Sequence, residues 1–158
     1  MLILGIDPGT ATTGYGIIRS SSNLFEVLEF GLITTDKDGT PGKRLENIYL
    51  EMTRILKKFS PDVMAIEKLF FAANQGVMIF AAAKYKIEVA EYAPGTIKKE
   101  VAGNGRADKK MIQKAIRKVL GAKVRSAAKK KTHFDNAADA LAVALCHAYR
   151  IRGGDNHG

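Results

Sequence analysis

The sequence predicts an α/β fold in which a mixed five-stranded sheet is covered by helices on both faces. Before residue 36 the chain consists of apolar runs separated by polar turns, which is typical of neighbouring antiparallel strands. After that point helical segments alternate with short apolar runs, which is typical of parallel strands joined by helices. At 158 residues the chain has the size of one domain, which we expect over residues 1–151 with a disordered tail at 152–158.

Apolar runs bounded by turn residues predict the strands, which in order are 2–6, 14–18, 25–33, 63–66 and 87–92. Helical segments lie between and after them. A stripe of apolar residues predicts a helix over 45–59, and a second helix is expected over 76–84. Asp108 can cap a third helix that ends at Gly121, and a fourth is expected over roughly 135–151.

An acidic residue stands at the end of two of the predicted core strands. Asp7 ends the first strand and Glu67 ends the fourth. Removing a carboxylate from water costs several kcal/mol unless something compensates its charge. We therefore expect these residues to face a metal ion or a phosphate at the sheet edge. The alternative for Asp7 is a turn residue that caps its own backbone beside Pro8.

The last predicted helix begins with a cluster of oxygen-bearing side chains. Residues three or four apart share a helix face, so Asp139 points the same way as Asp135 and Asn136. If this cluster meets Asp7 and Glu67, the result is an all-oxygen site that suits Mg²⁺ or Mn²⁺ rather than zinc. Two such ions about 3.5–4 Å apart can assist phosphodiester hydrolysis.

The charge of the chain is concentrated in one segment. The net charge is +9, and residues 97–131 contain thirteen Lys and Arg against two acidic residues. Such a basic belt is expected for a polyphosphate partner, and we favour nucleic acid over an anionic membrane or simple solvated helix faces. The single cysteine, Cys146, fits a packed thiol in a reducing compartment. No apolar run is long enough to span a bilayer and no signal peptide is evident, so a cytoplasmic location is expected.

Several motifs together resemble one known family. They are GIDPG (5–9), TGYG (13–16), PD (61–62), AIE (65–67), EYAP (91–94) and NAADALA (136–142). On these motifs the chain resembles the RuvC family of Holliday junction resolvases over nearly its whole length. The resemblance implies a ribonuclease H-like fold and a homodimer that nicks opposing strands of a four-way DNA junction symmetrically, in recombination and repair. It also implies Mg²⁺, or Mn²⁺ as a substitute, with two ions per site, and branch-migration helicase machinery as a partner.

The resemblance assigns roles to individual residues. Asp7, Glu67 and Asp139 match the metal-binding carboxylates of the family, with position 136 as a further ligand. Phe70 falls where the family has an aromatic residue that stacks near the junction centre. Lys98 and Lys109 match basic positions that contact phosphates near the cut, and a glycine-rich loop lies between them. In the basic belt, the further DNA-binding candidates are Arg106, Lys110 and Lys114.

The chain departs from the family pattern at two places. Position 136 usually carries an acidic residue, sometimes His, but here it is Asn, whose carbonyl can ligate a cation without supplying charge. Asp135 could substitute, the site could be weakened, or the asparagine could be an introduced change that blocks cleavage. The segment around 74–76 is also shorter than usual by roughly two to three helical turns.

Two rival functions follow from these features. The residues after Asp7 resemble the phosphate loop of actin-like and sugar-kinase ATPases, but those proteins need a second such domain. A closer rival is a junction-binding protein with a disabled catalytic site, because Asn136 replaces an acidic ligand. Metal-dependent nicking separates this rival from a nuclease, whereas DNA binding does not.

Overall fold

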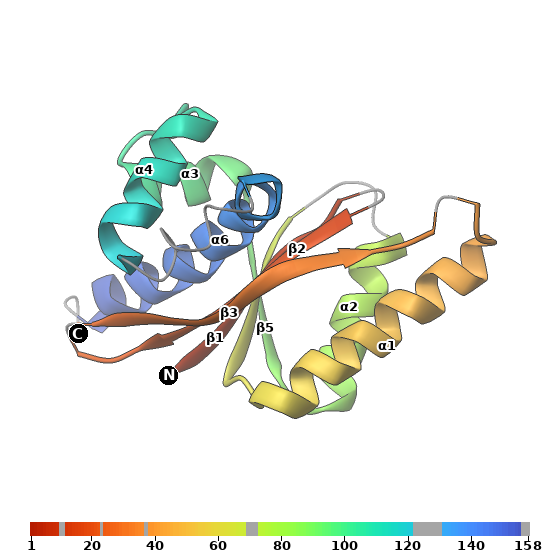
Figure 1. Ribbon diagram of the computed structural model, residues 1–158. Coiled ribbons are helices and arrows are strands. Elements are labelled where there is room, and N and C mark those ends of the chain that lie inside the picture. The colour runs from red at the N-terminus through yellow and green to blue at the C-terminus, as the bar shows by residue number, and fades with distance from the viewer. Residues whose placement is uncertain (10–11, 23, 37, 69–72, 122–130, 156–158) are drawn as a thin grey trace.

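A five-stranded mixed sheet forms the centre of the molecule (Figure 1). The computed structural model describes residues 1–9, 12–22, 24–36, 38–68, 73–121 and 131–155, with the backbone alone for 131–136 and 154–155. In sheet order the strands are β3 (Phe25–Thr34), β2 (Thr12–Ser20), β1 (Leu2–Asp7), β4 (Val63–Glu67) and β5 (Glu88–Tyr92). The first three are antiparallel, whereas β1, β4 and β5 are parallel. The predicted mixed sheet is thus confirmed.

Helices cover both faces of this sheet. One face carries α1 (Pro41–Phe59) and α2 (Ala73–Lys84), and the other carries α3 (Pro94–Ala102), α4 (Lys109–Leu120) and α6 (Lys131–Asp155) (Figure 1). Each face has its own apolar core, since buried residues form one cluster under α1 and α2 and another under the other three helices. The strands between the helices are buried on both sides, which explains their nearly continuous apolar sequences.

The structure differs from the sequence prediction at three helices. Helix α3 was not predicted, although Pro94 at its first turn and Gly103 after its end are ordinary helix boundaries. Helix α1 begins before residue 45, because Thr40 accepts a hydrogen bond from the Lys43 N–H and caps the helix. Helix α6 extends through residue 155, so the disordered tail expected from residue 152 is wrong for 152–155, and Arg152 lies over the Phe25 ring.

Helix α6 lies very close to the centre of the sheet. A Cβ atom placed on Gly5 of β1 would lie 2.1 Å from the Ala140 carbonyl oxygen and 2.8 Å from the Ala144 nitrogen. On Gly16 of β2 it would lie 2.5 Å from Cδ2 of Leu141. Gly5 and Gly16 are directly opposite each other in the β1–β2 pair. The helix therefore packs onto a strip of backbone that bears no side chains.

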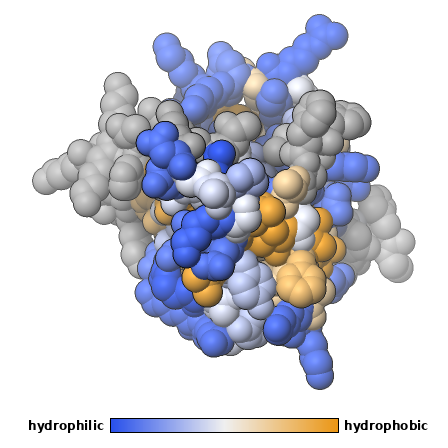
Figure 2. All heavy atoms as spheres, turned by 90° about the vertical axis from the view of Figure 1, so that its right-hand side faces the viewer, coloured by the Kyte–Doolittle hydropathy of each residue, from blue (hydrophilic) through white to orange (hydrophobic). Residues whose placement is uncertain are grey.

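The outer face of α1 and α2 exposes apolar side chains (Figure 2). Phe80 is 59% exposed and Leu50 is 55% exposed. Helix α2 has no charged residue before Lys84, its last position. An exposed helix of this composition is typical of a contact surface.

The close contact at Gly5 predicts a strong effect of one methyl group. Gly5→Ala should destabilise the protein by about 1–3 kcal/mol, because the methyl group collides with backbone that can move only if α6 shifts. Gly76→Ala is the matched control, since it lies in α2 with no atom within 4 Å of the added carbon. The control should be neutral or slightly stabilising. Urea unfolding measures both, and equal stabilities of the two variants would contradict the packing argument.

Candidate active site

Asp7 and Glu67 lie side by side because their strands are parallel neighbours. Ile6 of β1 is opposite Ile66 of β4, so the next residue on each strand reaches the same carboxyl edge of the sheet. The two carboxyl groups are close enough for a hydrogen bond between them to contribute to the pKa of Asp7. Such a bond requires a proton on one of the two carboxyl groups, because an ionised carboxylate is an acceptor only.

Helix α6 adds a third carboxylate to this edge. Asp139 precedes Ala140, the residue whose carbonyl oxygen faces Gly5, and its charge acts on Asp7. The close packing of α6 therefore sets how near Asp139 lies to the strand ends. Asp135 and Asn136 belong to the preceding turn of α6, but their side chains fall outside the described part of the chain.

The surroundings of Asp7 disfavour its negative charge. Burial, the hydrogen bond to Glu67 and the charges of Glu67 and Asp139 together raise the pKa of Asp7 to about 8, in that order of effect. The Lys109 ammonium opposes this shift without cancelling it. The nearby positive charge is thus too weak to keep Asp7 ionised near neutral pH, and the site holds a proton where a cation could stand.

The residues of this site fit a hard divalent cation. The donors are carboxylate oxygens, without a His or Cys among the three, and the raised pKa of Asp7 marks the deficit that such a cation would offset. The three carboxylates are not yet gathered around one point. Over the described ranges, no three His, Cys, Asp or Glu side chains are grouped closely enough to hold an ion. The structure thus joins Asp7 to Glu67 and places Asp139 within electrostatic reach.

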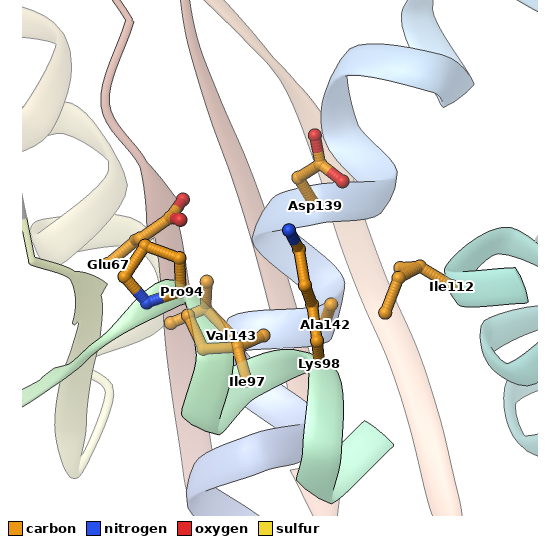
Figure 3. Close-up of a pocket in the computed structure, with 8 residues that line it drawn as sticks. All are labelled: Glu67, Pro94, Ile97, Lys98, Ile112, Asp139, Ala142 and Val143. Carbon is orange, nitrogen blue, oxygen red and sulfur yellow. The ribbon is translucent and has the colours of Figure 1, made fainter. Parts of the chain in front are cut away.

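Two lysines border the carboxylates from different helices. Lys109 is the first residue of α4, whose start is capped by Asp108, with 2.9 Å between Oδ1 and the Met111 nitrogen. Lys98 projects from α3, and its amino end points to the same side of a small pocket as the Asp139 carboxylate (Figure 3). Both predicted lysines therefore lie at the carboxylate cluster, and the glycine-rich loop expected between them, residues 103–106, lies between α3 and α4.

The other basic candidates lie on the outside of the same helical layer. Lys110 and Lys114 are exposed on α4, whose opposite face is buried through Ile112, Ile116 and Leu120. Arg106 is exposed in the loop between α3 and α4, where its N–H donates to the Asn104 side chain. Phe70 and the basic residues between 122 and 130 fall outside the described residues.

The carboxylates adjoin a pocket that sequence reasoning missed. It has a volume of about 120 Å³ and lies between α3, α4 and α6, with Glu67 of β4 at its edge (Figure 3). Its apolar lining includes Ile97, Ile112 and Val143. The pocket could not be expected from the sequence, because one of its walls is α3, which was not predicted.

Two further contacts hold the segments that carry the site residues. The Asn74 amide of α2 donates to the Gly9 carbonyl at 3.1 Å and so holds the chain just after β1. The Tyr92 hydroxyl, at the end of β5, is 2.6 Å from Nδ1 of the buried His147 on α6. The two contacts tie the turn after Asp7 and the helix of Asp139 to the rest of the fold.

Comparison with known proteins shows the family of the chain. The model of the family described as crossover junction endodeoxyribonuclease RuvC matches residues 3–147 of the chain. The chain belongs to the RuvC family. The RuvC protein of Alkaliphilus oremlandii is 43% identical over 159 residues, covering 94% of this chain and 93% of its own length. That of Thermotoga petrophila is 43% identical over 162 residues, covering 96% and 94%.

Solved structures of the RuvC family share the fold along the whole chain. Thermus thermophilus RuvC superposes with a TM-score of 0.83 at 29% identity, over 98% of this chain and 97% of that one. The same protein in complex with its Holliday junction substrate gives a TM-score of 0.85 at 28% identity. The ribonuclease H-like fold implied by the resemblance is thus confirmed. Within the described residues, no helix is long and apolar enough to cross a membrane.

The raised pKa of Asp7 predicts how stability depends on pH without metal. The folded protein keeps the Asp7 proton up to about pH 8, whereas the unfolded chain loses it near pH 4, so the folded state binds more protons between these values. Its stability should therefore fall as pH rises from about 4 to 8. Asp7→Asn carries no titrating group and should remove this loss, which amounts to a few kcal/mol because each pKa unit corresponds to about 1.4 kcal/mol.

Urea unfolding at pH 5, 7 and 9 with a chelator present measures the effect. The stability advantage of Asp7→Asn over the unmodified protein should grow from pH 5 to pH 9. Asp38→Asn, at an exposed loop position, is the control and should show no such trend. Parallel pH profiles for the unmodified protein and Asp7→Asn would contradict the assigned surroundings of Asp7.

Proposed function

We propose that this chain is a divalent-metal-dependent endonuclease that resolves four-way DNA junctions by paired, symmetric nicks. The observation that carries the proposal is the convergence of Asp7, Glu67 and the Asp139 helix at one sheet edge, bordered by Lys98 and Lys109. Family membership supports the substrate, since a relative of similar fold binds a Holliday junction. Its expected setting is DNA recombination and repair in the cytoplasm, with a branch-migration helicase as a partner.

The carboxylates would hold the metal in this activity. Asp7, Glu67 and Asp139 are the first ligands, and Asn136 or Asp135 completes the set from the preceding turn of α6. When bound, a pair of Mg²⁺ ions, or Mn²⁺ in their place, provides a reactive water at neutral pH and neutralises charge on the phosphate and the leaving oxygen. Asp7 would lose its proton on cation binding, because the cations would supply the positive charge that the proton supplies without them.

The basic residues would bind the DNA backbone. Lys98 and Lys109 are close enough to the carboxylates to contact the phosphate that is cut. Lys110, Lys114 and Arg106 extend the positive surface outward along α4 and its preceding loop, where junction arms can lie. Contacts of this kind position DNA without reading its sequence. Phe70 is proposed to stack near the junction centre.

Asn136 leaves one rival function, a junction-binding protein with a disabled site. An asparagine supplies a ligand oxygen but no charge, and the remaining carboxylates already include one that holds a proton. We propose that the site is active as written, because Asp135 precedes Asn136 on the same turn and adds a carboxylate to this end of α6.

A cleavage assay with a synthetic four-way junction tests the activity. The unmodified chain should nick opposing strands symmetrically with Mg²⁺, and Asn136→Asp should do so faster because it adds a charge for the ions. Asp7→Asn should lose at least about 1000-fold in rate, since removing several kcal/mol of stabilisation costs tenfold per 1.4 kcal/mol. Its junction affinity, measured by gel shift, should be retained or increased.

The outcomes of this assay separate the two functions. Cleavage by Asn136→Asp alone would show that position 136 is a ligand and that the chain is a disabled resolvase. Binding by both proteins without cleavage by either would favour the junction-binding function and overturn the proposed activity. Loss of junction binding by Asp7→Asn would mean that Asp7 has a structural role.

We also propose that the chain acts as a homodimer through the outer face of α1 and α2. A symmetric pair of nicks requires two active sites related by a twofold axis. The apolar side chains on this face, with the Tyr49 and Phe80 rings 6.0 Å apart between the two helices, offer a surface that a second copy could bury (Figure 2).

Replacing Phe80 tests this interface. Phe80→Glu should convert the dimer to a monomer in sedimentation equilibrium and abolish paired nicking, because a charge would be buried in an apolar contact. Leu24→Glu is the matched control, since Leu24 is 72% exposed at the turn between β2 and β3, away from α1 and α2. The control should remain dimeric. A dimeric Phe80→Glu protein would exclude this face as the interface.

A further inference from the structure

The pocket beside the carboxylates combines an apolar interior with a charged rim. Ile97 of α3, Ile112 of α4 and Val143 of α6 are buried and line its interior. Glu67, Lys98 and Asp139 stand at its edge, as their charged ends in Figure 3 show. Such a pocket favours a ligand with an apolar body and a charged group attached directly to it.

The size of the pocket limits the body of that ligand. Its volume of about 120 Å³ is somewhat smaller than the roughly 150 Å³ of an apolar protein cavity that holds benzene. A five-membered ring fits this space, whereas a purine with its sugar does not. The charged rim coincides with the residues proposed to bind the metal ions and the phosphate that is cut.

A phosphate in a DNA strand is linked through O3′ to a ring carbon of the deoxyribose on one side, and through O5′ and the C5′ methylene to the deoxyribose ring on the other side. If the phosphate lies against Lys98 and the carboxylates, the group nearest the pocket is one of these rings, because the base is farther along the nucleotide. We propose that this pocket receives the deoxyribose next to the cut phosphate and thereby selects DNA over RNA at that nucleotide. The inference rests on the proposed function and names a specificity determinant within it.

The selection would arise from an absence of hydrogen-bond partners. Over the described residues, the pocket lining contains no hydroxyl or amide side chain, and its charged groups belong to the rim that faces the phosphate. The backbone of Ile97, Ala142 and Val143 lies within helices α3 and α6. A ribose whose 2′-hydroxyl enters the apolar interior would bury that hydroxyl against methyl groups without a partner, and such burial is unfavourable.

A junction with one altered sugar tests the proposal directly. A single ribonucleotide is placed on one or the other side of the cut phosphate, and cleavage is compared with the all-DNA junction under single-turnover conditions. At one of the two positions the ribose should slow cleavage on the order of 10- to 100-fold. A 2′-fluoro sugar lacks the hydroxyl that donates a hydrogen bond. A junction that carries it at that position should therefore be cut nearly as fast as the all-DNA junction. A change below about twofold at both positions would overturn the proposal.

An abasic nucleotide at the same position separates the sugar from the base. It keeps the ring but removes the base, so cleavage should be retained if the sugar fills the pocket. A loss as large as that caused by ribose would mean that the base occupies it, which overturns the proposal. Failure of the proposed function looks different, because then neither this chain nor Asn136→Asp cuts the all-DNA junction.

A variant of the pocket completes the test. Val143→Thr keeps the shape of the side chain but adds an oxygen that can accept from a 2′-hydroxyl. The ratio of the DNA rate to the ribonucleotide rate should fall severalfold, although the all-DNA junction is still cut. An unchanged ratio in folded, active Val143→Thr and in a second variant, Ile97→Thr, would assign the selection elsewhere and overturn the role of the pocket.

Discussion

The close contact between helix α6 and two glycines of the sheet sets the position of the whole site. Gly5 and Gly16 leave the centre of the sheet bare, so α6 lies directly on the backbone, with the Ala140 carbonyl facing Gly5. Asp139 is the residue before Ala140, and Asp7 is two residues after Gly5. A helix held farther away by side chains would carry Asp139 away from the strand ends. Tyr92 and His147 join the same helix to β5 and limit its movement.

The electrostatics of the site follow from this geometry. Burial at this edge and the neighbouring carboxylates of Glu67 and Asp139 raise the pKa of Asp7. Asp7 therefore stays protonated at neutral pH when no cation is bound. Positive charge stands nearby on α3 and α4, and the Lys109 ammonium partly offsets the rise in the pKa of Asp7. Without a cation, the carboxylate cluster makes the fold less stable at neutral pH than uncharged side chains at the same positions would. Functional sites commonly carry such a cost in stability, and cation binding offsets it.

The sequence predicted the sheet, its mixed strand directions and two strand-end carboxylates, because short buried runs and their terminal residues are local signals. Asp108 as a cap and Gly121 as an end were local signals as well, and both hold. Helix α3 was missed although Pro94 stands at its first turn, where proline commonly begins a helix. The pocket could not be predicted, since its lining comes from three helices and depends on how they pack. The hydrogen bond between Tyr92 and His147 was missed for the same reason.

We propose that Asp7, Glu67 and Asp139 form one cation site because α6 lies against Gly5. Anomalous X-ray diffraction from crystals grown with Mn²⁺ tests this claim most directly, because it locates the ion without any assay of activity. We predict a Mn²⁺ peak within coordination distance of all three carboxylates, and its loss in Asp7→Asn crystals. A peak bound to residues elsewhere, or no peak beside Asp7 at saturating Mn²⁺, would contradict it.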